Sequence, residues 1–277
     1  MPVTVEVPES VEAVVGALGE RSGGEASGRD RRAVVIAGGT QLMPRLNTEA
    51  TGIGTLVSLR RAGLAGIEVG AGSATIGAAT TLSALGADDR LAFLRPVVES
   101  IASPSIRNLA TVGGNLFVAQ PYGDLAVALL ALDAEADLAG AGVSTRAVEE
   151  LVHDGPPAGG VVTAVRFSVP PEFRYRKAMR RRLNSASIVT VAAALTVEEG
   201  TVTAARIALG GAGATPRRAP SAEVALVGGP LDAARAEAAG RAALDDAEPF
   251  TDAYASAWYR GRVLPVHVRR ALMGETA

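Results

Sequence analysis

The stretch TVGGNLFVAQPYGD, residues 111–124, holds the features that decide the fold. Two adjacent glycines follow a threonine, an asparagine comes next, and an apolar run then leads to a single acidic residue, Asp124. Adjacent glycines are typical of a place where the backbone approaches another group closely. The stretch therefore predicts a tight turn against a ligand, with an acidic side chain waiting downstream.

Asp124 has two possible roles in this pattern. An ionised aspartate only accepts hydrogen bonds, which suits paired hydroxyl groups such as those of a ribose or ribityl chain. The alternative is an N-cap on the helix that the sequence predicts from Leu125, because aspartate is common at that position. Both roles can hold together, and the sequence leaves both open.

A second glycine turn, AGGTQ at residues 37–41, follows an expected buried strand and precedes an expected helical turn. Successive backbone N–H groups in such a turn can converge on an anion. The alternative is a strand–helix turn without a ligand. Neither a P-loop nor a dinucleotide fingerprint of the G-x-G-x-x-G type is present. Two glycine turns far apart in the chain instead predict one long ligand, such as a dinucleotide, held from two sides.

Composition narrows the class of protein. Of the 277 residues, 48% are hydrophobic and 20% charged, which predicts a folded chain of one large or two modest domains. The net charge of −2 gives no general attraction to nucleic acid or anionic membrane. The chain has no cysteine, which excludes thiolate catalysis and iron–sulfur ligation by this chain, so redox chemistry would need a bound cofactor or a partner.

Local patterns predict an α+β fold with a domain boundary near Pro170. The apolar run from Leu125 to Leu132 is far shorter than the ~20 residues of a membrane span, and we expect a cytoplasmic protein. A helix is expected from Val11, capped by Ser10. A polar surface loop is expected over residues 19–32. Strands are expected at 3–7, 33–37, 56–59, 67–70, 74–80 and 161–170, two antiparallel strands within 187–213, helices within 81–102, 221–247 and 251–273, and a helix followed by a strand within 125–140.

Three segments together resemble one known family. They are AGGTQLMPRLN (37–47), SIRNLATVGGNLFVAQPYGDLAVALLALDA (105–134) and FRYRKAMRRRLNSASIVTVAAAL (173–195). Their combination and order resemble the FAD-binding medium subunit of the molybdenum hydroxylases, of the carbon monoxide dehydrogenase and xanthine dehydrogenase type. The resemblance implies a two-lobed FAD-binding domain of the vanillyl-alcohol-oxidase (PCMH) type over residues 1–170, with lobes at about 1–60 and 61–170. A smaller α+β C-terminal domain of the CO dehydrogenase flavoprotein type would follow over residues 171–277.

The resemblance also implies the cofactor site. It places the first glycine turn around the FAD pyrophosphate, Asp124 at the cofactor, and Lys177 at the flavin ring. Lysine occurs once among 27 basic residues, and its ammonium would stabilise negative charge on a reduced flavin, although chance is the alternative. No catalytic residue and no metal ligand is expected. The expected FAD contacts are Ile36, Ala37, Gly38, Gly39, Thr40, Gln41, Ile101, Ala102, Thr111, Gly114, Asn115, Asp124, Val162 and Lys177.

The function implied by the resemblance is electron transfer. A large partner subunit would carry the molybdenum cofactor and a small partner two [2Fe–2S] clusters, arranged in the family manner as a dimer of heterotrimers. Electrons would reach noncovalent FAD in this chain and pass to an acceptor such as a quinone, oxygen or NAD⁺. Two alternatives stay open: a stand-alone FAD-dependent oxidase or dehydrogenase acting on a small molecule, and an interaction protein that has lost FAD.

Three further features have open interpretations. Tyr122 either covers a flavin face or packs at a surface. The run from Arg174 to Arg182 contains six basic residues in nine, a density found in nucleic-acid sites, but the negative net charge and the missing binding motif disfavour that role. His153 and His267 lie too far apart in sequence to suggest a metal site, and we expect surface or packing positions for both.

Overall fold

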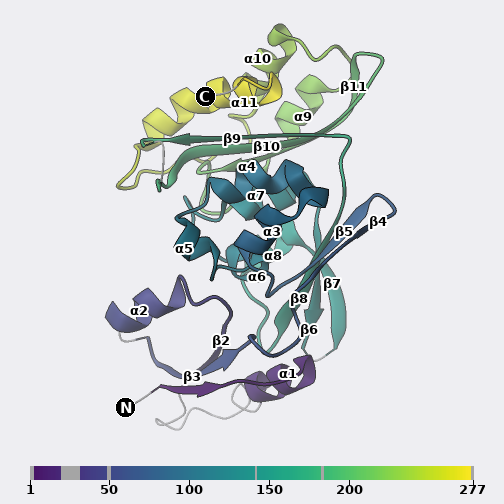
Figure 1. Cartoon of the computed structure of the whole chain (residues 1–277). Coiled ribbons are helices and arrows are strands. Elements are labelled where there is room, and N and C mark those ends of the chain that lie inside the picture. Colours follow the sequence, from purple (N-terminus) through teal and green to yellow (C-terminus); the bar gives the residue numbers. More distant parts are fainter. Residues whose placement is uncertain (1–2, 20–31, 49–50, 141, 182–183, 276–277) are drawn as a thin grey trace.

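The computed structural model describes residues 3–19, 32–48, 51–140, 142–181 and 184–275. It contains three sheets arranged one after another, with helices packed between and outside them (Figure 1). The mixed α+β class expected from the sequence is confirmed. Of the surface loop expected over residues 19–32, residues 20–31 lie outside the described ranges.

A small parallel sheet forms the N-terminal lobe. Its strand order is β1-β3-β2, and helix α1 packs against β2 and β3. Ser10 Oγ accepts a hydrogen bond from Ala13 N at 3.2 Å, so the expected cap of α1 is present. The apolar face of α1, with Val14 and Leu18, is buried against Val57. The elements are β1 (Thr4–Glu6), α1 (Val11–Gly19), β2 (Arg32–Ile36), α2 (Leu42–Thr48) and β3 (Ile53–Ser58).

Strand β2 departs from its expectation. The sequence predicts a buried strand at residues 33–37, because the run is continuously apolar. In the structure β2 is an edge strand whose residues from Ala33 to Ile36 are only half-buried. These residues line a cavity, and Ala33 and Val35 also pack against the core that α1 covers. An apolar run of this kind predicts a core strand, although here it forms one wall of the cavity.

An antiparallel sheet of five strands forms the middle lobe, in the order β4-β5-β8-β6-β7. Seven helical segments accompany it. The strands are β4 (Ile67–Gly70), β5 (Ser73–Gly77), β6 (Glu135–Ala139), β7 (Val143–Ala147) and β8 (Val161–Ser168). The helices are α3 (Leu82–Ala87), the 3-10 helix η1 (Asp89–Leu94), α4 (Arg95–Glu99), α5 (Pro104–Arg107), α6 (Val112–Leu116), α7 (Asp124–Ala131) and α8 (Val148–Asp154).

Helix α7 is the central element of the molecule. Every residue from Asp124 to Ala131 is buried, because the helix lies between the middle lobe and the C-terminal sheet (Figure 1). A helix surrounded by protein on all sides is hydrophobic all round. This explains why the apolar run at 125–132 shows little helical periodicity, and the helix-then-strand order expected over 125–140 is confirmed as α7 and β6.

A four-stranded antiparallel sheet of order β12-β11-β10-β9 forms the C-terminal domain. Side chains of β10 alternate between two cores. Val189 and Val191 pack in the C-terminal core, whereas Thr190 and Ala192 face α7 and the middle lobe. Strand β10 thus contributes side chains to the cores of both the C-terminal domain and the middle lobe. The strands are β9 (Glu172–Met179), β10 (Ser187–Glu198), β11 (Thr201–Gly210) and β12 (Arg217–Arg218).

Three helices cover the outer face of this sheet (Figure 1). They are α9 (Pro220–Leu226), α10 (Ala233–Ala242) and α11 (Ala257–Leu272). The helical segment expected over 221–247 is divided into α9 and α10, because Gly228, Gly229 and Pro230 interrupt it. The domain boundary expected at residue 170 falls in the short segment between β8 and β9. In the described part of the chain, no helix is both long and apolar enough to cross a membrane.

Candidate functional site

A cavity of about 920 Å³ extends from the N-terminal lobe, past the middle lobe, to the C-terminal sheet. All fourteen residues expected to contact FAD line it. They come from β2 and the turn after it, from the end of α4, from α6, from the start of α7, and from β8 and β9. The structure therefore gathers segments that lie far apart in sequence around one elongated space. Binding cavities are usually about 300–1,000 Å³ in volume.

The first glycine turn forms the wall on the side of the N-terminal lobe. Gly39 has φ +69°, a conformation that favours glycine. At Gly38 a Cβ atom would lie 1.9 Å from the carbonyl oxygen of Leu109, so this glycine is required by contact between the two lobes. The N–H groups of Gly39, Thr40 and Gln41 have no acceptor among the described residues. They are donors available to an anionic group in the cavity.

The second glycine turn opens helix α6 and faces the same cavity. Thr111 is its N-cap, and Thr111 Oγ1 accepts from Gly114 N at 3.2 Å. At Gly113 a Cβ atom would lie 2.8 Å from the Cβ of Ala78, at the end of β5. The close approach that the sequence assigns to a ligand is thus partly an approach to the protein's own chain. Both Gly113 and Gly114 line the cavity.

Asn115 presents an unsatisfied acceptor beside the cavity. The residue is 6% exposed, and among the described residues no group donates to its Oδ1 atom. A buried polar atom without a partner costs about 1–3 kcal/mol. A bound molecule that donates a hydrogen bond here would remove that cost. The donor set of the first turn and the acceptor of the second together fit a dinucleotide, which carries both phosphate oxygens and N–H or O–H donors.

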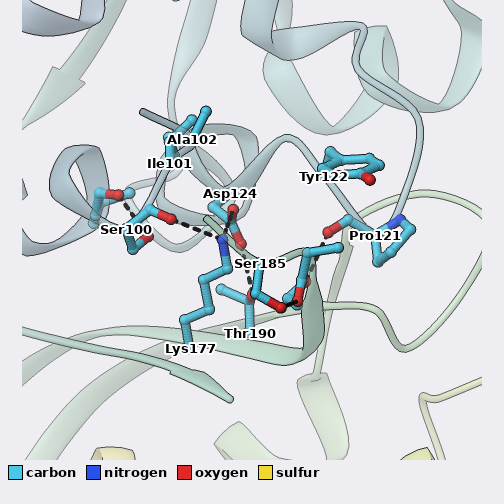
Figure 2. Close-up of polar contacts among 12 residues, drawn as sticks. Ser100, Ile101, Ala102, Pro121, Tyr122, Asp124, Lys177, Ser185 and Thr190 are labelled. Carbon is cyan, nitrogen blue, oxygen red and sulfur yellow. Dashed lines mark hydrogen bonds and ion pairs between the residues drawn. The ribbon is translucent and has the colours of Figure 1, made fainter. Parts of the chain in front are cut away.

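The far end of the cavity is built around Asp124 (Figure 2). Its Oδ2 accepts from Lys177 Nζ at 2.8 Å and its Oδ1 from Thr190 Oγ1 at 2.7 Å. Lys177 Nζ also donates to the carbonyl oxygen of Ser100 at 2.9 Å. The side chains of Lys177 and Asp124 are each 4% exposed. The only lysine of the chain is therefore used to join α4, α7 and β9 at the cavity wall.

The N-cap role considered for Asp124 is wrong. Gly123, with φ +79°, is the N-cap of α7, and Asp124 is the first residue of the helix. A negative charge in the first turn is favourable because the helix N-terminus is partially positive. Both carboxylate oxygens already accept hydrogen bonds from the protein. A hydroxyl group of a cofactor would therefore donate to an oxygen of Asp124 that already has one partner.

The charge of Lys177 is paired with that of Asp124 in the cavity wall. Asp124 balances the ammonium at contact distance, so the cavity wall carries a neutral pair instead of a free positive charge. Nearby, the hydroxyl groups of Tyr175 and Ser100 lie 2.8 Å apart. Burial, followed by the negative charge of Asp124, raises the pKa of Tyr175 well above its usual value. Tyr175 therefore stays a neutral phenol behind the wall.

Ile101 and Ala102 lie where the chain leaves α4 and turns along the cavity. Ala102 has φ +47°, a left-handed conformation that costs a non-glycine residue about 1–2 kcal/mol. Arg107 stabilises this turn, since its Nη1 atom donates to the carbonyl oxygens of Ile101 at 2.8 Å and Ala102 at 2.9 Å. A strained residue at a cavity wall is typical of a functional site.

Apart from Lys177, the sequence did not identify the cavity residues contributed by the C-terminal domain. Tyr254 lines the cavity and meets Tyr122, whose role was left open. The two hydroxyl groups are hydrogen-bonded, and the rings lie edge to face with centroids 6.1 Å apart. This bond, followed by burial, raises the pKa of Tyr122 to about 12. No local pattern could reveal a pair separated by 132 positions in sequence.

Most of the described basic residues in the run from Arg174 to Arg182 have partners within the chain. Arg174 bonds Glu172, Arg176 donates to His267 Nδ1 at 3.1 Å, and Arg180 donates to the carbonyl oxygen of Ala253 at 3.4 Å. The Arg174 contact lies within β9, whereas those of Arg176 and Arg180 join β9 and the residue after its end to the C-terminal elements. The run therefore has a structural explanation that does not need nucleic acid.

The two histidines lie apart. His153 is 79% exposed at its side chain and contacts Asp154, while His267 is half-buried. These are the surface and packing positions expected. The described residues contain no group of three or more side chains able to hold a metal ion together.

Comparison with known proteins gives a consistent picture. A family model described as the FAD binding domain in molybdopterin dehydrogenase matches residues 2–170, and one described as the CO dehydrogenase flavoprotein C-terminal domain matches residues 174–274. The chain is 31% identical to the carbon monoxide dehydrogenase medium chain of Afipia carboxidovorans, with 86% of each chain covered. It is 32% identical to subunit alpha of the 6-hydroxypseudooxynicotine dehydrogenase complex of Paenarthrobacter nicotinovorans, with 87% of this chain and 86% of that one covered.

Solved structures agree with the sequence comparisons. The chain superimposes on a chain of reconstituted CO dehydrogenase from Oligotropha carboxidovorans with a TM-score of 0.88 and 30% identity, covering 99% of this chain and 97% of the other. The similarity therefore includes both the cavity-forming lobes and the C-terminal domain.

Proposed function

Because the chain belongs to the FAD-binding subunits of the molybdenum hydroxylases, we propose that it holds one FAD noncovalently in the cavity and transfers electrons from partner subunits to an external acceptor. The bound flavin would supply the chemistry, since it can take up electrons and release them to another carrier. The residues of this chain would bind, orient and shield it. We propose no catalytic acid or base among them.

One observation carries the proposal: two glycine turns and a buried ion pair, from three parts of the chain, line a single cavity in which Asn115 Oδ1 lacks a donor. The N–H groups of Gly39, Thr40 and Gln41 would hold the pyrophosphate, because they are unpaired among the described residues. Asn115 would accept from the cofactor. The fourteen cavity residues named from the sequence are proposed as the contacts.

The Lys177–Asp124 pair would fix the wall near the flavin ring. Thr190 and the carbonyl oxygen of Ser100 complete its hydrogen bonds, so neither side chain is free to turn away. A preorganised pair can orient a ring without adding net charge. We propose that Lys177 acts as part of this pair and that Asp124 keeps it in place.

Partners follow from the family. The relatives compared are a medium chain and a subunit of a dehydrogenase complex, so they work within larger assemblies. We propose a large partner that holds the molybdenum cofactor and a small partner that holds [2Fe–2S] clusters, assembled as a dimer of heterotrimers. The described residues include no cysteine, which agrees with electrons arriving from clusters on another chain. A cytoplasmic location stays a prediction.

The first test is an absorption spectrum of the purified chain before and after acid precipitation. We expect a flavin band that moves to the supernatant, where chromatography identifies FAD. A colourless chain is then incubated with added FAD and passed over a desalting column. Failure to retain FAD would overturn the proposal and favour the interaction protein that has lost its cofactor. Reduction of the bound flavin by a small organic substrate, without partners, would instead support the stand-alone oxidase.

A further inference from the structure

Two tyrosines from different domains meet at the edge of the cavity. Tyr122 lies just before α7 in the middle lobe, two positions from Asp124 (Figure 2), and Tyr254 lies between α10 and α11. Both line the cavity, and Tyr122 is also 43% exposed. The pair therefore forms part of the cavity wall, and part of the Tyr122 side chain is accessible to solvent. Its hydroxyl groups are hydrogen-bonded, and its rings meet edge to face at 86°.

The backbone behind Tyr254 is firmly held. Asp252 Oδ1 accepts from Tyr254 N at 2.8 Å and from Ala255 N at 2.9 Å, and Asp252 Oδ2 accepts from Arg260 Nη2 at 2.7 Å. The Arg260 side chain is fully buried, with its guanidinium 4.5 Å from the centroid of the Phe250 ring. Arg260 also donates to the carbonyl oxygen of Ile188, two positions after the cavity-lining residue Ala186. Tyr254 thus projects from a fixed base.

The backbone beside Tyr122 is fixed to the same domain. Gln120 Nε2 donates to the carbonyl oxygen of Tyr122 at 2.8 Å, and Gln120 Oε1 accepts from Gly211 N at 2.6 Å. Both tyrosines therefore have anchored main chains, while their side chains meet through one hydroxyl bond and one ring contact. A contact of this kind can open by side-chain rotation without moving either domain.

We propose that Tyr122 and Tyr254 form a gate that selects electron acceptors by size. With the pair closed, a small acceptor such as dioxygen reaches the cofactor through side-chain fluctuations, whereas a bulky dye is hindered. The inference rests on the proposed function, because it needs FAD in the cavity. It adds an acceptor-selecting role for two residues that are not among the fourteen proposed cofactor contacts.

The test uses the full chain loaded with FAD and reduced anaerobically with dithionite, after removal of excess reductant. Stopped-flow absorption then follows reoxidation by dioxygen or by 2,6-dichlorophenolindophenol. In either reaction two electrons and two protons leave the reduced cofactor, and they yield hydrogen peroxide from dioxygen or the leuco form of the dye. The ratio of the two rates reports the size of the opening.

Tyr254→Ala removes both the hydroxyl hydrogen bond and the ring contact between the two tyrosines. We expect its reoxidation by the dye to become about tenfold faster, the effect of losing one ring contact and one hydrogen bond, while the rate with dioxygen changes much less. Tyr254→Phe and Tyr122→Phe keep the rings and lose the hydroxyl bond, so they should lie between the wild type and Tyr254→Ala. A second readout is quenching of flavin fluorescence by neutral acrylamide, which should increase in the same order.

Tyr259→Ala is the matched control, because Tyr259 is 44% exposed on α11 and does not line the cavity. It should leave both rates and the quenching unchanged. If wild type and Tyr254→Ala bind FAD equally and show the same ratio of rates, the gate is overturned while FAD binding stands. Loss of FAD by Tyr254→Phe with retention by Tyr259→Ala would also overturn it, since Tyr254 would then hold the cofactor. A wild-type chain that takes up no FAD would refute the proposed function itself.

Discussion

Asp124 Oδ2 and Lys177 Nζ lie 2.8 Å apart, and this ion pair joins the first turn of α7 to strand β9. The helix belongs to the middle lobe and the strand to the C-terminal sheet. Both side chains are 4% exposed, so the pair lies away from solvent screening. The attachment of the C-terminal domain and the shape of the cavity wall therefore depend on the same two charges.

Replacing one partner should destabilise the chain strongly. In Lys177→Met, the carboxylate of Asp124 keeps Thr190 but loses its charged partner. An uncompensated buried charge costs about 3–5 kcal/mol, so we expect the free energy of unfolding to fall by that amount. Urea denaturation of the FAD-free chain measures it, because bound cofactor would add its own stabilisation.

The double variant Asp124→Asn with Lys177→Met separates charge from packing. It buries no ionised group at this position, so it should be more stable than Lys177→Met alone. A coupling free energy of about 0.5–3 kcal/mol is typical of residues in direct contact. Strict additivity of the two single substitutions would show that the pair does not interact as the structure describes.

Much of this arrangement could be predicted from the sequence where local patterns carry the signal. The cap at Ser10 and the paired strands β10 and β11 follow from side-chain chemistry and alternation, and both are confirmed. Strand β9 was not predicted, because its basic residues hide the alternation that marks a half-buried strand. The partners of Arg176 are His267 on α11 and the carbonyl oxygen of Glu275, which local patterns cannot reveal.

In the candidate site, too, some residues could be predicted from the sequence and others could not. The glycine turns, Asn115, Asp124 and Lys177 stand out in sequence, and all line one cavity. Their partners do not stand out, because no local pattern links Asp124 to Thr190 or marks Tyr254 as a cavity residue. The roles of Gly38 and Gly113 in packing against the chain itself needed the folded backbone.

Asn115→Ala should change stability and affinity in opposite directions. The substitution removes an acceptor that lacks a donor among the described residues, so the FAD-free chain should be as stable as the wild type or slightly more stable. Affinity for FAD should fall by about 10- to 100-fold, the value of one to two good hydrogen bonds to the cofactor. Urea denaturation and fluorescence titration with FAD measure the two effects.

Asn108→Ala is the control for that experiment, since Asn108 is exposed and accepts from Ser83 outside the cavity. It should leave FAD affinity unchanged. An unchanged affinity in Asn115→Ala would show that Oδ1 does not accept from the cofactor.

His267 should make stability depend on pH. Burial, followed by the positive charges of Arg176 and Arg270, lowers its pKa from 6.5 to about 4. Between these values the unfolded chain takes up a proton that the folded chain does not, so stability is complete above about pH 6.5 and declines as pH falls toward 4. In His267→Gln this part of the decline should disappear. Urea midpoints measured across that range test it.

His153→Gln serves as the comparison for His267, because His153 is exposed. As pH falls, the stability of His153→Gln should decline much as that of the wild type does, whereas the stability of His267→Gln should decline less. Parallel curves for the wild type and His267→Gln between pH 4 and 6.5 would contradict the assigned shift. Carboxylates that titrate in the same range affect all three proteins, so the differences between curves isolate the histidine.

Gly38 and Gly16 offer a paired test of how the two lobes meet. In Gly38→Ala the new Cβ would lie 1.9 Å from the backbone oxygen of Leu109, which cannot move away as a flexible side chain could. We expect a loss of about 3 kcal/mol or more, at the upper end for overpacking, with weakened FAD binding because the first turn must shift. Gly16 lies on the exposed side of α1 with nothing within 4 Å of an added Cβ, so Gly16→Ala should stabilise the chain by about 0.5–1 kcal/mol. Urea denaturation of both variants measures these changes in stability. Equal stability of Gly38→Ala and the wild type would mean that the N-terminal lobe does not pack against Leu109. The cavity between the lobes would then have a different shape.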